Sequence, residues 1–328
     1  MTTPVPLERI FISGGAGFIG SFFVDRLLAD TAVRRVTVYD NLSSGSEWHL
    51  EPHANDERLR VVRDDLKNER PLASAMEGHD TVIHLASNPD IAKAMTDPTI
   101  DFVEGTLLTH NVVEAMRRTG VHRILYASGS GVYGDLGETE ADEDYGPLIP
   151  VSTYGASKLA GEALISSYAF MFDMQGAVFR FGNVVGGRQT HGVGFDFVHR
   201  LLQDRGSLRI LGDGTQSKSY IDVDDVIGAV LLVAERQSAT FRAYNIATGD
   251  YITVREIADL AVEVVGLRPA DVRYTYTGGN RGWKGDVPVV RLKTDRIREL
   301  GWSNRLNSRE ALRASMQKMI PLVHSGAI

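Results

Sequence analysis

The stretch of sequence that decides the fold is RIFISGGAGFIG, residues 9–20. An apolar run over residues 9–13 is followed at once by four glycines, and residues with helical periodicity come next. The glycines satisfy a G-x-G-x-x-G spacing from Gly15 and a G-x-x-G-x-x-G spacing from Gly14. Such glycines permit a tight turn and let the backbone approach a pyrophosphate, whose charge is met by free N–H groups and the helix dipole. The segment therefore predicts the strand, turn and helix of a dinucleotide-binding fold.

Short apolar strands alternate with longer helical stretches through the first 180 residues. Strands are predicted over residues 9–13, 34–40, 59–63, 81–86 and 123–128, and helices over 18–29, 100–119 and 153–172. This alternation predicts an α/β fold with a Rossmann-type doubly wound parallel sheet.

The rhythm changes after Gly182. A glycine-rich stretch over 186–194, a helix over 195–203 and two further glycines in 211–216 indicate a second, smaller α/β lobe. We expect residues 1–180 to form the NAD-binding domain and residues 181–328 the substrate domain. Residues 220–235 predict a strand entering an apolar helix, so the segment 220–248 is a candidate to return to the first domain.

Two acidic positions follow predicted strands of the first domain. Asp40 lies twenty residues beyond Gly20, where a carboxylate accepts hydrogen bonds from both hydroxyls of an adenosine ribose and repels a 2′-phosphate. The sequence therefore favours NAD over NADP. Asp64-Asp65-Leu66 closes the third strand, where an acidic side chain can accept a hydrogen bond from the adenine amino group. On sequence alone, a solvated acidic turn explains that segment almost as well.

Tyr154 and Lys158 form a Tyr-x-x-x-Lys pair on a predicted helix, and the i,i+4 spacing places both on one face. A tyrosine with a pKa near 10 is a poor base at neutral pH, but a nearby ammonium stabilises the phenolate and lowers that pKa. The lysine can also hold the nicotinamide ribose. In isolation such a pair is common on helix surfaces. It indicates a catalytic site here because a dinucleotide-binding segment precedes it on the same chain.

Composition excludes several classes of function. The net charge is −7, with no basic stretch to follow a phosphate backbone, so nucleic acid is not expected as a partner. The absence of cysteine excludes disulfides and thiol catalysis, and it fits a cytoplasmic location. Residues 1–8 do not have the pattern of a signal peptide, and no apolar run reaches the roughly 20 residues of a membrane span. The histidines form no metal set, so no metal is predicted.

Beyond these patterns, the chain resembles the extended short-chain dehydrogenase/reductases, and within them the UDP-glucose 4-epimerases. The resemblance covers essentially the whole chain. The segments that carry it are residues 14–20, 40–45, 84–86, 132–134, 154–158, 180–186, 212–216 and 281–288.

The resemblance implies a role for each of a set of residues. Tyr154 would be the base and Lys158 its activator. The cofactor NAD would be held by Gly14, Gly17, Phe18, Ile19, Gly20, Asp40, Asn41, Ser43, Ser44, Gly45, Asp65, Leu66, Leu85, Ala86, Ser87, Tyr154, Lys158 and Phe181. The substrate would be held by Asn88, Ser128, Ser130, Asn183, Arg188, His191, Lys218, Arg281 and Asp286. Among these, Asn183, Lys218 and Arg281 match positions that bind the nucleotide diphosphate, although Arg281 also fits an exposed loop position. Arg188, His191 and Lys218 are candidates to pair with a substrate carboxylate.

The chain departs from the family pattern at two positions. The family places a Ser or Thr four residues before the tyrosine of Val132-Tyr133-Gly134, where its hydroxyl bridges the sugar and the catalytic tyrosine. That position is Gly129 here. Ser128 and Ser130 flank it, and we take Ser130 as the replacement, although alternate residues of an extended segment point to opposite sides. Relatives also often carry asparagine at the position of Gly105.

The function that the resemblance implies is NAD-dependent 4-epimerisation of a UDP-hexose by transient oxidation at C4. Two alternatives use the same first step, namely 4,6-dehydration and UDP-glucuronate decarboxylation. Dehydratases typically need Asp-Glu where this chain has Ser130-Gly131, and decarboxylases often carry Ser-Glu there. A different class, a protein that binds NAD and a nucleotide sugar without turnover, is motivated by Gly129. The resemblance also implies a homodimer formed through the helices over 100–119 and 153–172.

Overall fold

The computed structural model describes residues 7–328, and the first six residues of the expected N-terminal domain lie outside the described residues. A seven-stranded sheet forms the larger lobe, in the order β11-β6-β5-β4-β1-β2-β3. The strands are β1 (Arg9–Ser13), β2 (Arg35–Asp40), β3 (Leu59–Arg63), β4 (Thr81–His84), β5 (Arg123–Gly129), β6 (Gln175–Phe181) and β11 (Phe241–Ile246). All neighbouring pairs are parallel. The predicted Rossmann-type fold class is confirmed.

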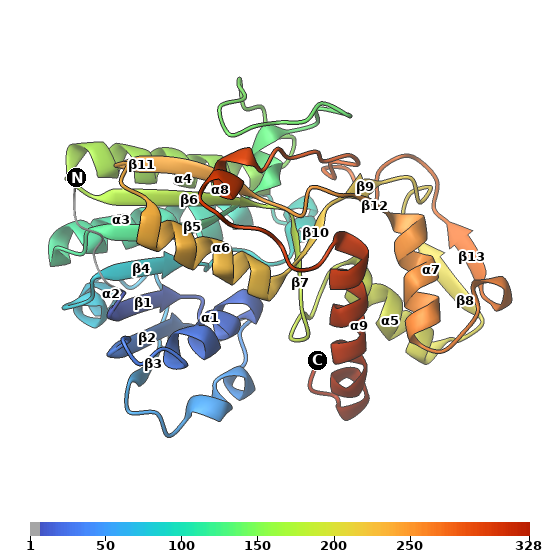
Figure 1. Ribbon diagram of the computed structural model, residues 1–328, viewed down its shortest axis with the longest axis horizontal. Coiled ribbons are helices and arrows are strands. Elements are labelled where there is room, and N and C mark those ends of the chain that lie inside the picture. The colour runs from blue at the N-terminus through green and yellow to red at the C-terminus, as the bar shows by residue number, and fades with distance from the viewer. Residues whose placement is uncertain (1–6) are drawn as a thin grey trace.

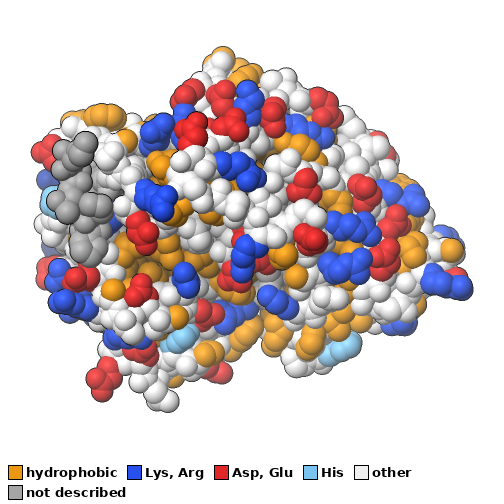
Figure 2. Space-filling view, viewed as in Figure 1, with side chains coloured by type: hydrophobic (Ala, Val, Ile, Leu, Met, Phe, Trp, Pro, Cys, Tyr) orange, Lys and Arg blue, Asp and Glu red, His pale blue; other side chains and the backbone are white. Residues whose placement is uncertain are grey.

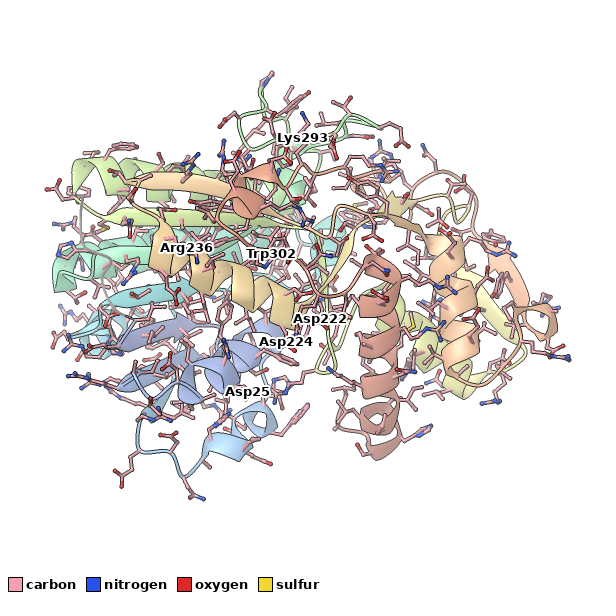
Figure 3. The ribbon with its side chains drawn as sticks, in the orientation of Figure 1. Asp25, Asp222, Asp224, Arg236, Lys293 and Trp302 are labelled. Atoms are coloured by element: carbon pink, nitrogen blue, oxygen red, sulfur yellow. The ribbon has the colours of Figure 1, made fainter. Side chains whose placement is uncertain are left out.

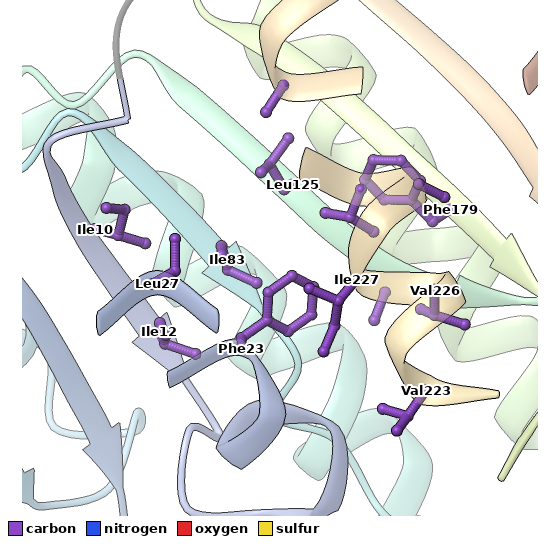
Figure 4. Close-up of a cluster of buried hydrophobic side chains, with 14 of the residues drawn as sticks. Ile10, Ile12, Phe23, Leu27, Ile83, Leu125, Phe179, Val223, Val226 and Ile227 are labelled. Atoms are coloured by element: carbon purple, nitrogen blue, oxygen red, sulfur yellow. The ribbon is translucent and has the colours of Figure 1, made fainter. Parts of the chain in front are cut away.

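Helices cover both faces of this sheet (Figure 1). One face carries α1 (Phe18–Leu28) and α6 (Val223–Arg236), and the other carries α2 (Glu69–Met76), α3 (Leu108–Thr119) and α4 (Thr153–Met171). Side chains of β1 alternate between the two cores, because successive residues of a strand point to opposite faces. Ile10 and Ile12 pack with Phe23 of α1, as Figure 4 shows, whereas Phe11 packs in the other core.

The smaller lobe lies on the right in Figure 1. Its helices α5 (Val193–Gln203), α7 (Val254–Val264) and α9 (Ser308–Ser325) pack on one another around an apolar core. Short strands pair beside them, with β7 (Asn183–Val185) next to β10 (Tyr220–Asp222), β8 (Ser207–Ile210) next to β13 (Arg273–Tyr276), and β9 (Ser217–Lys218) next to β12 (Ile252–Thr253). The short helix α8 (Asp295–Glu299) contacts β11 of the large sheet.

The chain passes between the lobes at a polar junction, where Figure 3 labels Asp222, Asp224 and Trp302. Asp222 caps the start of α6 by accepting from the Asp224 N–H at 3.0 Å. Trp302 is buried, and its indole N–H donates to the Asp225 carbonyl at 3.1 Å. These contacts fix the second lobe against α6, so the space between the lobes has a defined shape.

The largest difference from the predicted elements lies in the helix expected over 100–119. Residues Phe102–Leu107 form a π-helix, and α3 begins only at Leu108. A Cβ atom at Gly105 would overlap the Ser157 hydroxyl of α4, so the π-helix and α4 pack closely at this glycine. An asparagine at this position, which relatives often carry, would require the Ser157 hydroxyl to move. Other predicted ends differ from the observed ones by one or two residues.

Candidate active site

A cavity of about 890 Å³ lies between the lobes, at the carboxyl ends of the sheet strands. This is where doubly wound sheets bind ligands, because the connections on either side of the sheet's switch point diverge. Seventeen of the eighteen residues predicted for the cofactor line it, and Gly45 is the exception. Eight of the nine residues predicted for the substrate line it as well, and Arg281 is the exception.

The glycine-rich turn is built so that no side chain fits between its backbone segments. Gly14 has φ +75°, and a Cβ atom there would lie 2.8 Å from the Ala86 backbone nitrogen. A Cβ atom at Gly20 would overlap the Gly14 carbonyl oxygen. Gly17 is the N-cap of α1, and within residues 7–328 no side chain caps this end. The helix therefore offers free N–H groups and the positive end of its dipole to the cavity.

Asp40 lies at the end of β2 and is held by the same turn. Its carboxylate accepts from the Ala16 N–H at 2.9 Å and from the Leu42 N–H at 2.9 Å. Burial raises the pKa of Asp40, and these two hydrogen bonds oppose the rise. A carboxylate oxygen accepts more than one hydrogen bond, so capacity remains for ribose hydroxyls. Gly45 packs behind this group, since a Cβ atom there would lie 3.0 Å from Asp40 Oδ1.

Asp65 also faces the cavity, and its carboxylate is already oriented by neighbours. It accepts from the Asn41 side-chain amide at 3.0 Å and from the Lys67 N–H at 2.9 Å. Leu66 beside it is buried and lines the cavity. These residues form an edge that suits a flat heterocycle with an amino group. The turn, Asp40 and this edge together fit the adenosine half of NAD.

The reactive pair lies at the other end of the cofactor region. Lys158 lies one turn of α4 after Tyr154, and its ammonium lies 5.5 Å from the centre of the Tyr154 ring. Lys158 is 4% exposed and donates to the Ala127 carbonyl at 2.8 Å. Burial raises the pKa of Tyr154 to about 12, with a hydrogen bond from Ser87 opposing the rise. Burial lowers the pKa of Lys158 to about 8.

Asp101 is a buried carboxylate beside this pair that the sequence analysis did not identify. It is 1% exposed, and it accepts from the Asn88 amide at 2.8 Å and from the Thr153 hydroxyl at 2.6 Å. Its charge favours the ammonium form of Lys158 and opposes ionisation of Tyr154. Nothing in the local sequence distinguishes it, because it precedes the π-helix and meets its partners only through tertiary contacts.

Ser128 and Ser130, which flank Gly129, have different surroundings. The Ser128 hydroxyl is buried and donates to Glu162 at 2.6 Å, and Glu162 pairs with Arg180 at 2.7 Å. Ser130 lines the cavity, half-buried, and its hydroxyl bonds no described residue. Gly129 itself is extended, with open space where a Cβ atom would stand. Ser128 is therefore committed to the buried ion pair, whereas Ser130 is available to a ligand.

The cations predicted to bind the substrate are each paired with a carboxylate. Lys218 pairs with Asp286 at 2.6 Å, and Arg188 pairs with Asp25 at 2.9 Å. Arg281 lies away from the cavity lining, where it pairs with Asp135 at 2.5 Å and donates to the Asp286 carbonyl. Asn183 donates to the Ser219 carbonyl at 3.1 Å.

Other lining residues were not predicted. They include His49, Glu104, Gln189, Arg200, Arg209 and Trp283.

No cluster of metal-ligating side chains occurs among residues 7–328. His84 is fully buried, and its ring nitrogens bond the hydroxyls of Ser13 at 2.6 Å and Thr109 at 3.1 Å. Burial lowers its pKa to about 3.

No helix within the described part of the chain is long and apolar enough to cross a bilayer.

Comparison with known proteins places these features in a family. Residues 10–247 match the NAD dependent epimerase/dehydratase family. The chain is 31% identical to the UDP-glucose 4-epimerase of Mycolicibacterium smegmatis, over 94% of this chain and 97% of that protein. It is 35% identical to a UDP-galactose 4-epimerase of known crystal structure, with a TM-score of 0.82 and coverage of 95% and 99% of the two chains. The NAD complex of Thermus thermophilus UDP-glucose 4-epimerase matches with 29% identity and a TM-score of 0.84, over 98% of this chain and all of that chain.

Proposed function

This chain belongs to the NAD dependent epimerase/dehydratase family, and from that premise we propose that it is an NAD-dependent 4-epimerase of a UDP-hexose. The observation that carries the proposal is the continuity of one cavity from Asp40, through Tyr154 and Lys158, to Lys218. A dinucleotide, a base and a paired cation for a diphosphate are thereby brought into one space. The relatives named UDP-glucose 4-epimerase match over nearly their whole length, which supports the same activity here.

The residues of the chain divide the reaction between them. When bound, NAD would accept a hydride from C4 of the sugar and return it to the opposite face of C4. Tyr154 takes the proton of the 4-hydroxyl as the ketone forms and gives it back afterwards. Lys158 stabilises the phenolate by its charge, and Asp101 keeps that lysine protonated. The cofactor residues are those already named around Asp40 and the glycine-rich turn.

The same cavity favours epimerisation over the two related reactions. Dehydration of the sugar needs an additional acid and base close to the ketone. Ser130 and Gly131 line the cavity where such a pair would stand, and neither can supply a carboxyl group. Decarboxylation needs a uronate substrate. Of the three residues predicted to pair with its carboxylate, Arg188 is already paired with Asp25 and Lys218 is assigned to the diphosphate. That leaves His191 alone, which favours a neutral hexose over a uronate.

We also propose a homodimer in the cytoplasm. Large apolar side chains remain exposed near α3 and at the end of α4, namely Phe102, Phe170 and Met171. Exposed large apolar side chains on neighbouring helices support an interface, because their contact with water is unfavourable. The lack of cysteine supports a reducing compartment.

The test is a proton NMR time course of the purified protein with NAD and, in turn, UDP-glucose, UDP-N-acetylglucosamine and UDP-glucuronate. A new anomeric doublet with the coupling pattern of the C4-inverted sugar is expected, with UDP-glucose faster than UDP-glucuronate. Tyr154→Phe should abolish that signal while NAD binding persists. Unchanged spectra for all three sugars, with NAD and UDP both bound, would instead indicate the non-catalytic binding protein that Gly129 suggests.

A further inference from the structure

A row of buried polar side chains crosses the carboxyl ends of β5, β6 and β11. The strand register pairs Ser128 with Arg180, and Arg180 with Asn245. The residues two positions earlier on each strand belong to the apolar core on the side of α4. Because side chains alternate along a strand, the three polar side chains point to that side as well. Each of them is 5% exposed or less.

Glu162 of α4 joins this row to the helix. Its carboxylate accepts from the Ser128 hydroxyl at 2.6 Å, and from Nη2 and Nε of Arg180 at 2.7 Å and 3.1 Å. Nη1 of Arg180 donates to the Tyr133 hydroxyl at 2.9 Å, and that hydroxyl donates to the Asn245 amide oxygen at 2.8 Å. Glu162 is itself 5% exposed, so both charges of the ion pair are removed from water.

Stability of the core does not by itself account for this network. Desolvation of two charges is costly, and apolar side chains of similar volume often stabilise a core equally well or better. Hydrogen bonds differ from apolar contacts because they depend on direction as well as distance. The bonds to Glu162 therefore favour one rotation and one axial position of α4 on the strands.

The reactive pair lies on the same helix, in the two turns that precede Glu162. Lys158 comes four residues before Glu162, and its ammonium donates to the Ala127 carbonyl at 2.8 Å. Ala127 and Ser128 are consecutive, so two neighbouring bonds join α4 to β5, one through the lysine and one through Glu162. A shift of α4 along the strand would displace Lys158 and Tyr154 together.

We propose that Ser128, Glu162 and Arg180 are positioning residues, which fix α4 on the ends of β5 and β6 and so hold the reactive pair at C4 of the sugar. The inference rests on the proposed epimerase function. It gives Ser128 a role other than the substrate contact that the family resemblance implies. The charge of Glu162 also favours the ammonium form of Lys158, so an experiment has to separate position from charge.

Two variants make that separation, and both are assayed with NAD and UDP-glucose. Ser128→Ala removes one bond to Glu162 and leaves the ion pair in place. The charge-free variant, Glu162→Gln with Arg180→Met, removes both charges together and leaves no lone buried charge. Each should lower kcat about tenfold or more, because a misplacement of about 1 Å can cost about 10²-fold, with KM and the Kd for NAD unchanged. Ser167→Ala, an exposed serine of α4, is the matched control and should change none of these values.

The inference stands only if both variants lower kcat. A loss in Ser128→Ala alone would overturn it in favour of a direct contact between that hydroxyl and the sugar. A loss in the charge-free variant alone would overturn it in favour of an electrostatic effect on Lys158. Unchanged kcat in both, or an NAD affinity that falls in parallel with kcat, would reduce the network to a structural role.

Amide hydrogen exchange over residues 153–158, followed by mass spectrometry, reports on the same contact without turnover. A wild type that binds NAD but does not epimerise would refute the proposed function alone, and exchange would then decide the inference. Faster exchange over 153–158 in both variants, with protection of residues 108–119 in α3 retained, would support it. Exchange equal to that of the wild type would overturn it.

Discussion

At the scale of single residues, the proposed reactive pair consists of two buried groups, and burial shifts each pKa in the direction that favours the neutral form. Burial places the pKa of Tyr154 at about 12 and that of Lys158 at about 8. The phenol is therefore protonated at neutral pH in the protein alone. Asp101 supports the charge on Lys158 from one side, so the ammonium that the reaction requires is present near pH 7 at a cost in stability.

That cost predicts a pH-dependent gain in stability for Lys158→Met. The pKa of Lys158 falls from 10.5 to about 8 on folding, so below pH 8 the folded protein bears the penalty of a buried charge. Between pH 8 and 10.5 the unfolded chain binds more protons, and the stability of the wild type rises with pH. Urea unfolding of the cofactor-free proteins should show the variant more stable by about 1–3 kcal/mol at pH 7, with the difference shrinking toward pH 10. A difference that does not depend on pH would contradict the buried charge.

Gly129 provides the second prediction at this scale. Its backbone is extended and nothing lies within 4 Å of a Cβ atom, so Gly129→Ser fits without strain. The new hydroxyl restores the family's bridge between sugar and tyrosine, and kcat should rise about tenfold or more. Gly129→Ala is the control, because it adds the same Cβ atom without a hydroxyl. Equal rates for the serine and alanine variants would show that Ser130 already performs this step.

At the scale of elements, the site depends on where backbone segments touch. The turn between β1 and α1 lies against the Leu85-Ala86 backbone after β4, and α4 lies against the π-helix at Gly105. Both contacts exist only because one partner has no side chain. They place the helix dipole of α1 and the reactive face of α4 on the same cavity.

Gly14→Ala should therefore disable the protein at two levels. A Cβ atom there would lie 2.8 Å from the Ala86 backbone nitrogen, and the backbone conformation at φ +75° disfavours alanine. We expect a loss of about 2–4 kcal/mol in the free energy of unfolding, combining strain with a backbone displacement. NAD binding should be lost as well. Gly228→Ala on α6 is the matched control, since its Cβ atom meets open space and should stabilise the helix by about 0.5–1 kcal/mol. Equal stabilities in chemical denaturation would refute the tight turn.

At the scale of the whole molecule, two lobes share one cavity and one polar junction. The Arg305 guanidinium bonds Asp225 at 2.7 Å across this junction, beside Trp302. β10 of the second lobe leads directly into α6, which packs on the large sheet.

At this scale we predict that the protein is a dimer that depends on the end of α4. The double substitution Phe170→Glu with Met171→Glu places charges on the exposed apolar end of α4 and should convert a dimer to a monomer. Sedimentation velocity measures the change. Val61→Glu, on the exposed side of β3, is the control and should leave the dimer intact. A wild type that sediments as a monomer would rule out the proposed interface.

The sequence by itself determined the fold class and the cofactor, and it predicted the proposed reactive pair. Each rests on residues close together in the chain, since the glycine turn, the strand ending at Asp40 and the i,i+4 pair Tyr154 and Lys158 are local patterns. Nearly all of the predicted lining residues do line the cavity for the same reason, because the carboxyl ends of parallel strands meet at one edge.

Only the tertiary structure decided which of these groups are free. Arg281 and Arg188 are engaged by Asp135 and Asp25, each on a distant segment, and Ser128 is engaged by Glu162. Asp101 and His49 reach the site through tertiary contacts that no local sequence pattern predicts. The charge and hydrogen bonding of a side chain depend on its neighbours in space, and packing sets those neighbours across tens of residues.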